Sequence, residues 1–336
     1  MKTKKIISFI AVFMILIFLV TETEKTTVCV KDALNLCVNA VIPSLFPFFV
    51  ISGLLVKLGF VTVLGKILSP VSRLCFNQSG KGAVVFLIGI ICGYPTGAKV
   101  IADIYKEKGF SRDDAERLLA FCNNSGPLFV IGAIGTNMLA DYNLGVALYI
   151  IHILSAVFVG VILRKSGKRQ KETMLCDIGV KSISQAVSES VEGAVKSILN
   201  VCGYVVFFSI LCAIVKDVFL VSILEVTTGA KNIIAYGFGE KITFVLLSGI
   251  IGFGGICVLF QVQSAVCDTG LSLKFYILGK VTQSFISMVL AFLYVNLFEI
   301  KPAFATISVP EHTVNAVVIM FLISAVFSLF RLTKKG

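Results

Sequence analysis

Two short segments interrupt apolar stretches of the sequence: residues 92–99 (CGYPTGAK) and residues 225–231 (EVTTGAK). Both end in Thr-Gly-Ala-Lys. Placing a lysine, or a helical turn weakened by glycine, in the hydrocarbon of a membrane costs free energy unless it lines a polar site. Because many transporters consist of two related halves that meet at one such site, the repetition predicts two related halves here.

The composition is that of a polytopic membrane protein. Apolar residues make up 57% of the chain and charged residues 15%, and the mean hydropathy is +0.96. We expect an all-α fold in a single membrane domain, residues 1–336, with about eight transmembrane helices plus two re-entrant hairpins in inverted-topology repeats. The net charge of +11 comes from basic residues in short loops. These residues are expected to set the orientation in the membrane rather than to bind nucleic acid.

The order of apolar and polar segments predicts the organisation of the chain. Residues 1–27 are expected to form an N-terminal signal-anchor helix, residues 28–171 the first repeat, residues 172–298 the second repeat, and residues 299–336 a C-terminal transmembrane helix around 313–330. Each repeat is expected to begin with an amphipathic interfacial helix, at 28–41 or 181–196, followed by a span at 42–63 or 198–215. Residues 64–82 are expected to be a basic loop. Threading places the three strongly basic segments on one face, so both termini are predicted to be cytoplasmic.

Each repeat is also expected to contain a broken helix, a re-entrant hairpin and a closing span. The broken helices are predicted around residues 92–97 and 225–231, because proline and glycine weaken the helical hydrogen bonding there. The hairpins are predicted at residues 118–139, with the polar tip 123–127 (NNSGP), and at residues 242–266, with the tip 252–255 (GFGG). The closing spans are predicted at 144–163 and 275–298.

Enzymatic chemistry finds little support in the sequence. The ten cysteines show no Cys-x-x-Cys spacing, and the two histidines are far apart, so we expect no metal, no cofactor and no catalytic residues. The glycines at 252–255 lack the strand, helix and lysine of a phosphate-binding loop. His152 lies in a predicted span and is expected to be packed and hydrogen-bonded.

The broken helices and hairpins are predicted to surround a cavity for a small polar solute. Lys99 and Lys231 would favour an anion, although both could instead reach toward lipid headgroups. Glu225 could bind the solute, carry a proton or form an internal ion pair, and Gln261 could bind the solute or only link helices. The predicted substrate-binding residues are Tyr94, Pro95, Thr96, Gly97, Lys99, Asn123, Asn124, Ser125, Gly126, Glu225, Thr228, Gly229, Lys231, Gly254, Gly255 and Gln261.

Four motifs resemble those of the YlbJ-type sporulation integral membrane proteins. They are residues 43–49 (PSLFPFF), 92–99, 122–129 (CNNSGPLF) and 252–256 (GFGGI) with Gln261. The resemblance covers nearly the whole chain. The wider group carries the nucleoside-recognition, or gate, domain.

The resemblance implies a cell-membrane protein of a spore-forming bacterium, made in the mother cell. It also implies that dipicolinic acid passes through the protein across the outer forespore membrane. The implied partners are dipicolinate, the lipid bilayer, and either a second copy of the chain or other sporulation membrane proteins. Two alternatives stay open: a transporter of nucleosides or other small solutes, and a membrane scaffold in spore envelope assembly that transports nothing.

Overall fold

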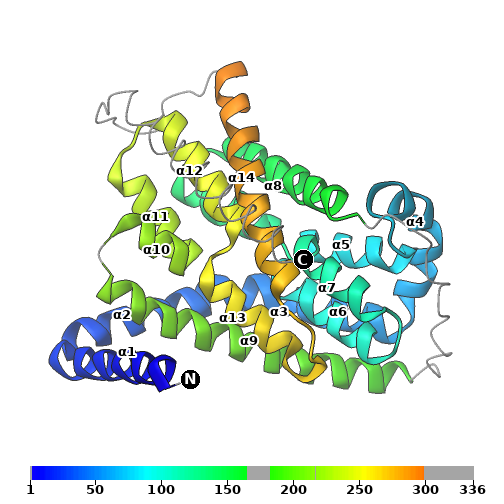
Figure 1. Cartoon of the computed structure of the whole chain (residues 1–336), viewed down its shortest axis with the longest axis horizontal. Coiled ribbons are helices and arrows are strands. Elements are labelled where there is room, and N and C mark those ends of the chain that lie inside the picture. The colour runs from blue at the N-terminus through cyan, green and yellow to red at the C-terminus, as the bar shows by residue number, and fades with distance from the viewer. Residues whose placement is uncertain (1, 165–181, 216, 299–336) are drawn as a thin grey trace.

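The computed structural model describes residues 2–164, 182–215 and 217–298, and within these ranges the chain forms helices joined by short connections (Figure 1). This confirms the all-α prediction. The predicted last span at 313–330 lies outside the described residues, as does nearly all of 164–171, one of the three strongly basic segments.

Five helices of the described part are long and apolar enough to cross a membrane. They are Thr23–Lys57, Tyr142–Ile162, Ile183–Ile214, Glu240–Thr269 and Lys274–Leu297. A sixth candidate is the pair α4 (Phe60–Phe76) and α5 (Gly80–Cys92), which is bent by 87°. The protein is therefore an integral membrane protein with several spans, as predicted.

Two very long helices run beneath the rest of the molecule in Figure 1. The first joins α2 (Thr23–Leu36), the π-helical η1 (Cys37–Val41) and α3 (Ile42–Lys57) into 35 residues, and the second is α9 (Ile183–Ile214), with 32 residues. The predicted interfacial helices are thus continuous with the spans that follow them. The π-helical turn lies just before Pro43, where it accommodates the proline ring without ending the helix.

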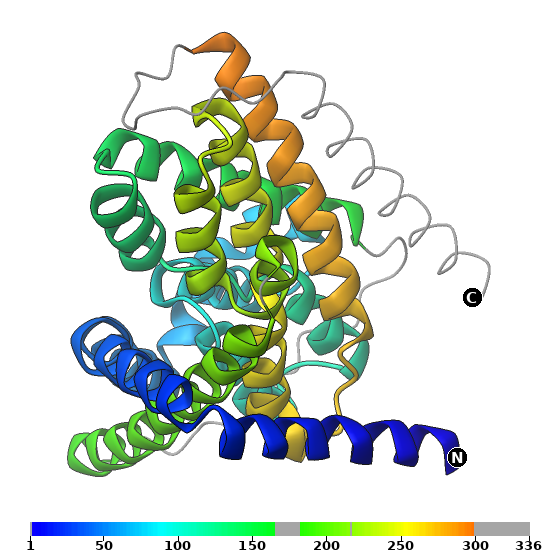
Figure 2. The same cartoon turned by 90° about the vertical axis from the view of Figure 1, so that its left-hand side faces the viewer.

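The two long helices pack against each other where α3 crosses α9. Gly53 approaches Ser190 there, and the Lys57 ammonium lies 2.6 Å from the Glu189 carboxylate. Only 11% of the apolar part of Thr23–Lys57 is buried, which suits a helix whose other faces meet lipid. The first helix, α1 (Lys2–Thr21), extends away from the body of the molecule (Figure 2).

After the first long helix the chain continues with α4, an amphipathic helix. α4 occupies most of residues 64–82, which were predicted as a basic loop, so that prediction is wrong. Its buried side consists of Val61, Gly65, Ser69, Ser72 and Phe76 at helical spacing, whereas Lys66 and Arg73 are exposed. The basic residues thus occupy the outer face of an amphipathic helix. Following α5 come α6 (Thr96–Lys106), α7 (Arg112–Phe121), the π-helical η2 (Leu128–Met138) and α8 (Tyr142–Ile162).

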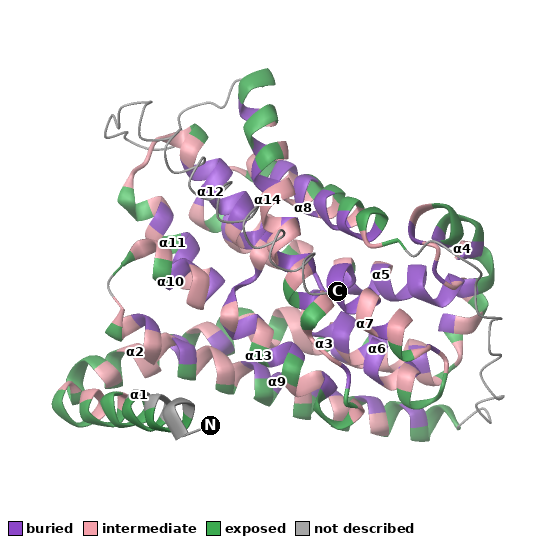
Figure 3. Cartoon of the chain, in the orientation of Figure 1, coloured by how far each residue is buried: buried purple, intermediate pink, exposed green. Residues whose placement is uncertain are grey.

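The second half consists of α10 (Val218–Leu224), α11 (Val226–Tyr236), α12 (Glu240–Phe253), α13 (Gly255–Val266), the short η3 (Cys267–Thr269) and α14 (Lys274–Leu297). Of the apolar part of Glu240–Thr269, 72% is buried, and Figure 3 shows buried residues concentrated on α5, α6 and α12. α8 and α14 pack against each other, and both contribute residues to the two large hydrophobic cores. They therefore tie the two halves together.

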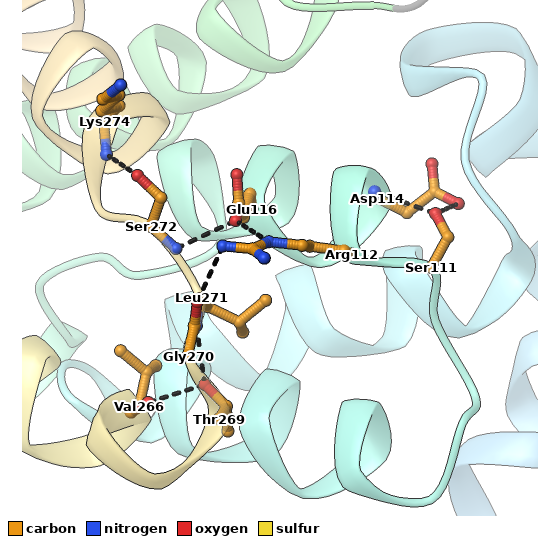
Figure 4. Close-up of polar contacts among 10 residues, drawn as sticks. All are labelled: Ser111, Arg112, Asp114, Glu116, Val266, Thr269, Gly270, Leu271, Ser272 and Lys274. Carbon is orange, nitrogen blue, oxygen red and sulfur yellow. Dashed lines mark hydrogen bonds and ion pairs between the residues drawn. The ribbon is translucent and has the colours of Figure 1, made fainter.

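A polar contact also joins the halves at the start of α14 (Figure 4). Arg112 donates to the carbonyl oxygen of Gly270 at 2.9 Å, and Glu116 accepts from the backbone N–H of Ser272 at 2.9 Å. Arg112 and Glu116 are themselves paired at 2.8 Å. Two side chains of α7 thereby fix the loop that leads into α14.

Candidate functional site

Residues 93–95, which join α5 to α6, form a hairpin turn that we call the first tip. A Cβ atom on either Gly89 or Gly97 would overlap the carbonyl oxygen of Cys122, so α5 and α6 flank the same oxygen. Residues eight apart in one continuous helix would lie about 12 Å apart along its axis. The chain therefore reverses between the two glycines, and the straight broken helix predicted at 92–97 is wrong.

The segment 122–127, which follows α7, is the first break. It was predicted as a hairpin tip, but α7 packs against α14 and η2 packs against α8. α7 also contacts α8, but α7 and η2 have different main neighbours and do not pair as the arms of a hairpin would. The segment's polar residues Asn123, Asn124 and Ser125 are fully buried, as expected for a polar segment enclosed by protein. Gly126 lies against Gly93 of the first tip.

The second half repeats this arrangement. Glu225 joins α10 to α11 and forms the second tip, and these two helices approach so closely that a Cβ atom on Gly229 would overlap Ser222. Gly254 and Gly255, both with positive φ, form the second break between α12 and α13. A Cβ atom on Gly255 would lie 3.3 Å from the carbonyl oxygen of Leu224, so the second break touches the second tip.

The hairpin predicted at 242–266 is wrong for the same reason as the one at 118–139. Glu240–Thr269 is one long span with a break, not two antiparallel arms. The structure does contain two hairpins, but at the segments predicted as broken helices. Each half thus has a hairpin, a broken helix and a long helix in the same order: α5–α6, α7–η2 and α8, then α10–α11, α12–α13 and α14.

Glu225 caps the N-terminus of α11 with both carboxylate oxygens. It accepts from the backbone N–H groups of Thr227 at 2.8 Å and Thr228 at 2.6 Å, and from the Thr228 hydroxyl at 2.8 Å. A carboxylate in this place also meets the positive end of the helix dipole. The ion pair with Lys99 or Lys231, one of the alternatives for Glu225, does not form; neither lysine lies within 4.0 Å of Glu225 among the described residues.

The two tips and the first break meet in a group of polar side chains that we call the inter-tip cluster. The Tyr94 phenol of the first tip lies near Ser125 of the first break, Glu225 of the second tip and Tyr276 of α14. Tyr276 in turn faces Asn123. Thr96 follows the first tip directly, at the start of α6, and Gln261 lies on α13, which packs against α6. The cluster is Tyr94, Thr96, Asn123, Ser125, Glu225, Gln261 and Tyr276.

Five buried polar atoms of the inter-tip cluster have no hydrogen-bond partner among the described residues. They are Thr96 Oγ1, Asn123 Nδ2, Ser125 Oγ, Gln261 Oε1 and Tyr276 OH. The other five atoms of this kind in the described part are scattered over α2, α4, α9, α12 and the start of α5. Buried polar groups are normally hydrogen-bonded, so this concentration indicates a place where a polar solute or water completes the bonding.

Next to the inter-tip cluster lies a second polar group, which we call the α14 network. Lys280 donates to Gln283 Oε1 at 2.8 Å and to Asn124 Oδ1 at 3.4 Å. Gln283 also donates to Asn124 Oδ1 at 3.0 Å and lies 3.4 Å from His152 Nδ1. His152 Nε2 accepts from the backbone N–H of Ser125 at 3.0 Å, so in this arrangement the imidazole is neutral. His152 is packed and hydrogen-bonded, as predicted.

Sequence reasoning missed Lys280, Gln283 and Tyr276, although a signal was available. With Ser287 they recur at intervals of four, three and four residues, which places them on one face of α14. The structure shows all four side chains buried on that face, and the Ser287 hydroxyl lies 2.8 Å from that of Ser155 on α8. A polar stripe inside an apolar span is the pattern that would have revealed them.

The two lysines of the repeated Thr-Gly-Ala-Lys segments do not lie together. Lys99 donates to the carbonyl oxygen of Gly193 and to the hydroxyl of Ser197, both at 2.9 Å, and so links α6 to α9. Lys231 is exposed on α11. Of the other predicted residues, Pro95, Gly97, Gly126, Gly229, Gly254 and Gly255 shape the tips and breaks, and Thr228 supports Glu225.

The different surroundings of the two lysines lead to a paired prediction. We expect Lys99→Met to lower the melting temperature of the purified protein, because it removes two hydrogen bonds from a charged donor, each worth about 1.5–3 kcal/mol. Lys231→Met should leave the melting temperature unchanged. Both variants should keep their rate of solute uptake per folded molecule. Loss of uptake without loss of stability would instead mean that these lysines bind the solute.

No group of three or more His, Cys, Asp or Glu side chains in the described ranges could hold a metal ion. Comparison with known proteins gives two matches. Residues 38–134 match the family model described as "Gate: Nucleoside recognition". The chain is also 26% identical over 299 residues to the sporulation integral membrane protein YlbJ of Bacillus subtilis (strain 168), covering 75% of this chain and 73% of that protein. These matches support the resemblance to the YlbJ-type sporulation integral membrane proteins.

The matched family model covers only part of the site described above. Residues 38–134 contain the first tip and the first break, and therefore Tyr94, Thr96, Asn123 and Ser125. The second tip and α14 lie outside that range. No solved structure matches the chain.

Proposed function

We propose that this protein is a sporulation membrane transporter that moves dipicolinate, a flat aromatic dianion, from the mother cell toward the forespore. The solute would occupy the inter-tip cluster, and the membrane would be the outer forespore membrane. The proposal includes no chemical conversion of the solute.

The observation that carries the proposal is the chemistry of the unpartnered atoms. Four of the five, Thr96 Oγ1, Asn123 Nδ2, Ser125 Oγ and Tyr276 OH, can donate hydrogen bonds. A dicarboxylate offers several strong acceptors and no donors, so it complements such a set. The rings of Tyr94 and Tyr276 could pack against its pyridine ring. Because Asn123 and Tyr276 come from different halves, the solute would bridge the halves, as in transporters with a site between two repeats.

A nucleoside is the second candidate, and a different observation favours it. The cluster also holds two acceptors, the Glu225 carboxylate and Gln261 Oε1, and the matched family model is described as nucleoside recognition. A nucleoside presents both donors and acceptors, so it could use them. The wider group's description does not fix the substrate, however, because one fold serves many solutes.

Uptake by proteoliposomes containing the purified chain separates these candidates. We expect accumulation of labelled dipicolinate above that of protein-free liposomes, with the compound recovered unchanged. Unlabelled dipicolinate should compete, whereas an unlabelled nucleoside should not. Uptake of nucleosides in place of dipicolinate would support the second candidate. Uptake of neither would leave the membrane-scaffold alternative.

A further inference from the structure

Lys280 is a buried amine for which the described residues supply no negative partner. Its side chain is 3% exposed, and its two hydrogen bonds go to the neutral amide oxygens of Gln283 and Asn124. No carboxylate lies within 4.0 Å of it in the described part of the chain. An ammonium group has three donors, so at least one N–H has no acceptor among these residues.

Burying a lysine here costs more free energy than is needed if the side chain only links helices. A neutral side chain such as glutamine could join α14 to Asn124 without the cost of burying a charge. Two turns further on, the neutral pair Ser287 and Ser155 joins α14 to α8. Ionisable residues inside apolar spans mark solute or ion pathways, and their charge is normally balanced. An anionic ligand would supply that balance for Lys280.

The position of Lys280 relative to the inter-tip cluster identifies where that ligand lies. Tyr276, with its unpartnered hydroxyl, is one helical turn before Lys280 on the same face of α14. Asn124, which accepts from Lys280, is the neighbour of Asn123 and Ser125, which carry two more unpartnered atoms. Lys280 therefore lies close to three unpartnered donors: Tyr276 OH on α14, and Asn123 Nδ2 and Ser125 Oγ in the first break.

We propose that Lys280 is the residue that makes this site select an anion, and that it binds one carboxylate of the solute beside Asn123 and Tyr276. The proposal rests on the transport function above and replaces Lys99 and Lys231 as the source of positive charge. His152 is neutral in this arrangement and adds no charge. Glu225, which lies near Tyr94, has its oxygens engaged by the N-terminus of α11. One buried cation and four neutral donors therefore face the solute.

The test compares two solutes of nearly equal shape and different charge: dipicolinate and its neutral diamide, pyridine-2,6-dicarboxamide. Wild-type proteoliposomes should take up the dianion at least about tenfold faster than the diamide. Lys280→Gln should lower dipicolinate uptake about 10- to 100-fold, the loss expected for a hydrogen bond between two charged groups, and should leave diamide uptake unchanged or raised. Lys280→Arg should retain much of the preference for the dianion.

The matched control is Lys274→Gln, an exposed lysine at the start of the same helix, which should behave as wild type. Lys280→Met, which keeps the length of the side chain, is used if Lys280→Gln does not accumulate in folded form. Unchanged dipicolinate uptake in a folded Lys280→Gln or Lys280→Met protein would overturn the proposal. Equal wild-type uptake of both solutes would also overturn it, whatever the variants do. Wild-type uptake of neither solute would instead count against the transport function itself.

Discussion

Replacing Gly97 with alanine is expected to prevent the protein from accumulating in folded form. The new methyl group would overlap the carbonyl oxygen of Cys122, a backbone atom held between α5 and α6. Because a backbone atom cannot rotate away as a flexible side chain can, the first tip would have to leave the first break. We expect a loss of about 3 kcal/mol or more, at the upper end of the usual cost of overpacking. The measurement is the amount of monodisperse protein extracted from membranes and its melting temperature.

Gly203→Ala is the matched control for this substitution. Gly203 lies within α9, and a Cβ atom on it would meet nothing within 4 Å. The control should accumulate like the wild type, or slightly better, because alanine favours helices more than glycine does. If Gly97→Ala accumulated and melted like Gly203→Ala, the close docking of the first tip on the first break would be contradicted.

Replacing Asn123 with leucine is expected to abolish most solute uptake while leaving a folded protein. Leucine has a similar volume, but it removes the unpartnered Nδ2 donor and places an apolar group where we propose that a carboxylate binds. Loss of one hydrogen bond to a charged group corresponds to a decrease of about 10- to 100-fold in uptake at low solute concentration. Asn123 Oδ1 accepts one hydrogen bond from the described residues, from the Ala98 N–H at 3.4 Å, and because this bond is long the stability cost should be small.

A pair of serine variants controls for the general effect of removing a buried hydroxyl. Ser125 and Ser69 both carry an unpartnered buried Oγ, but only Ser125 belongs to the inter-tip cluster. Ser125→Ala should reduce dipicolinate uptake, whereas Ser69→Ala on α4 should not. Equal effects of the two variants, or normal uptake by a folded Asn123→Leu protein, would mean that the solute binds elsewhere.

Much of the membrane architecture could be predicted from the sequence, because long apolar runs leave few alternatives to helices. The burial of Asn123, Asn124 and Ser125 was also predictable, since unpaired polar groups cannot face lipid. The sequence could not distinguish a hairpin from a broken helix. Glycine and proline weaken a helix equally in both, and the direction of the next helix depends on contacts with distant segments, such as that of Gly89 with Cys122.

The repeated Thr-Gly-Ala-Lys segments were the most misleading part of the sequence. They mark equivalent places, at the start of the helix that follows each tip, but they do not give their lysines equivalent neighbours. Lys99 meets α9, whereas Lys231 is exposed. The buried cation is Lys280, which lies in no repeated motif and is recognisable only from its place on the polar stripe of α14.

The most direct test of the site is a structure of the purified protein with dipicolinate at saturating concentration. We predict density for a flat dicarboxylate between the two tips, with its oxygens within hydrogen-bonding distance of Asn123 Nδ2 and Tyr276 OH and one carboxylate next to Lys280. Density beside Lys99 or Lys231, or an inter-tip cluster filled only by water under these conditions, would contradict the site that we propose.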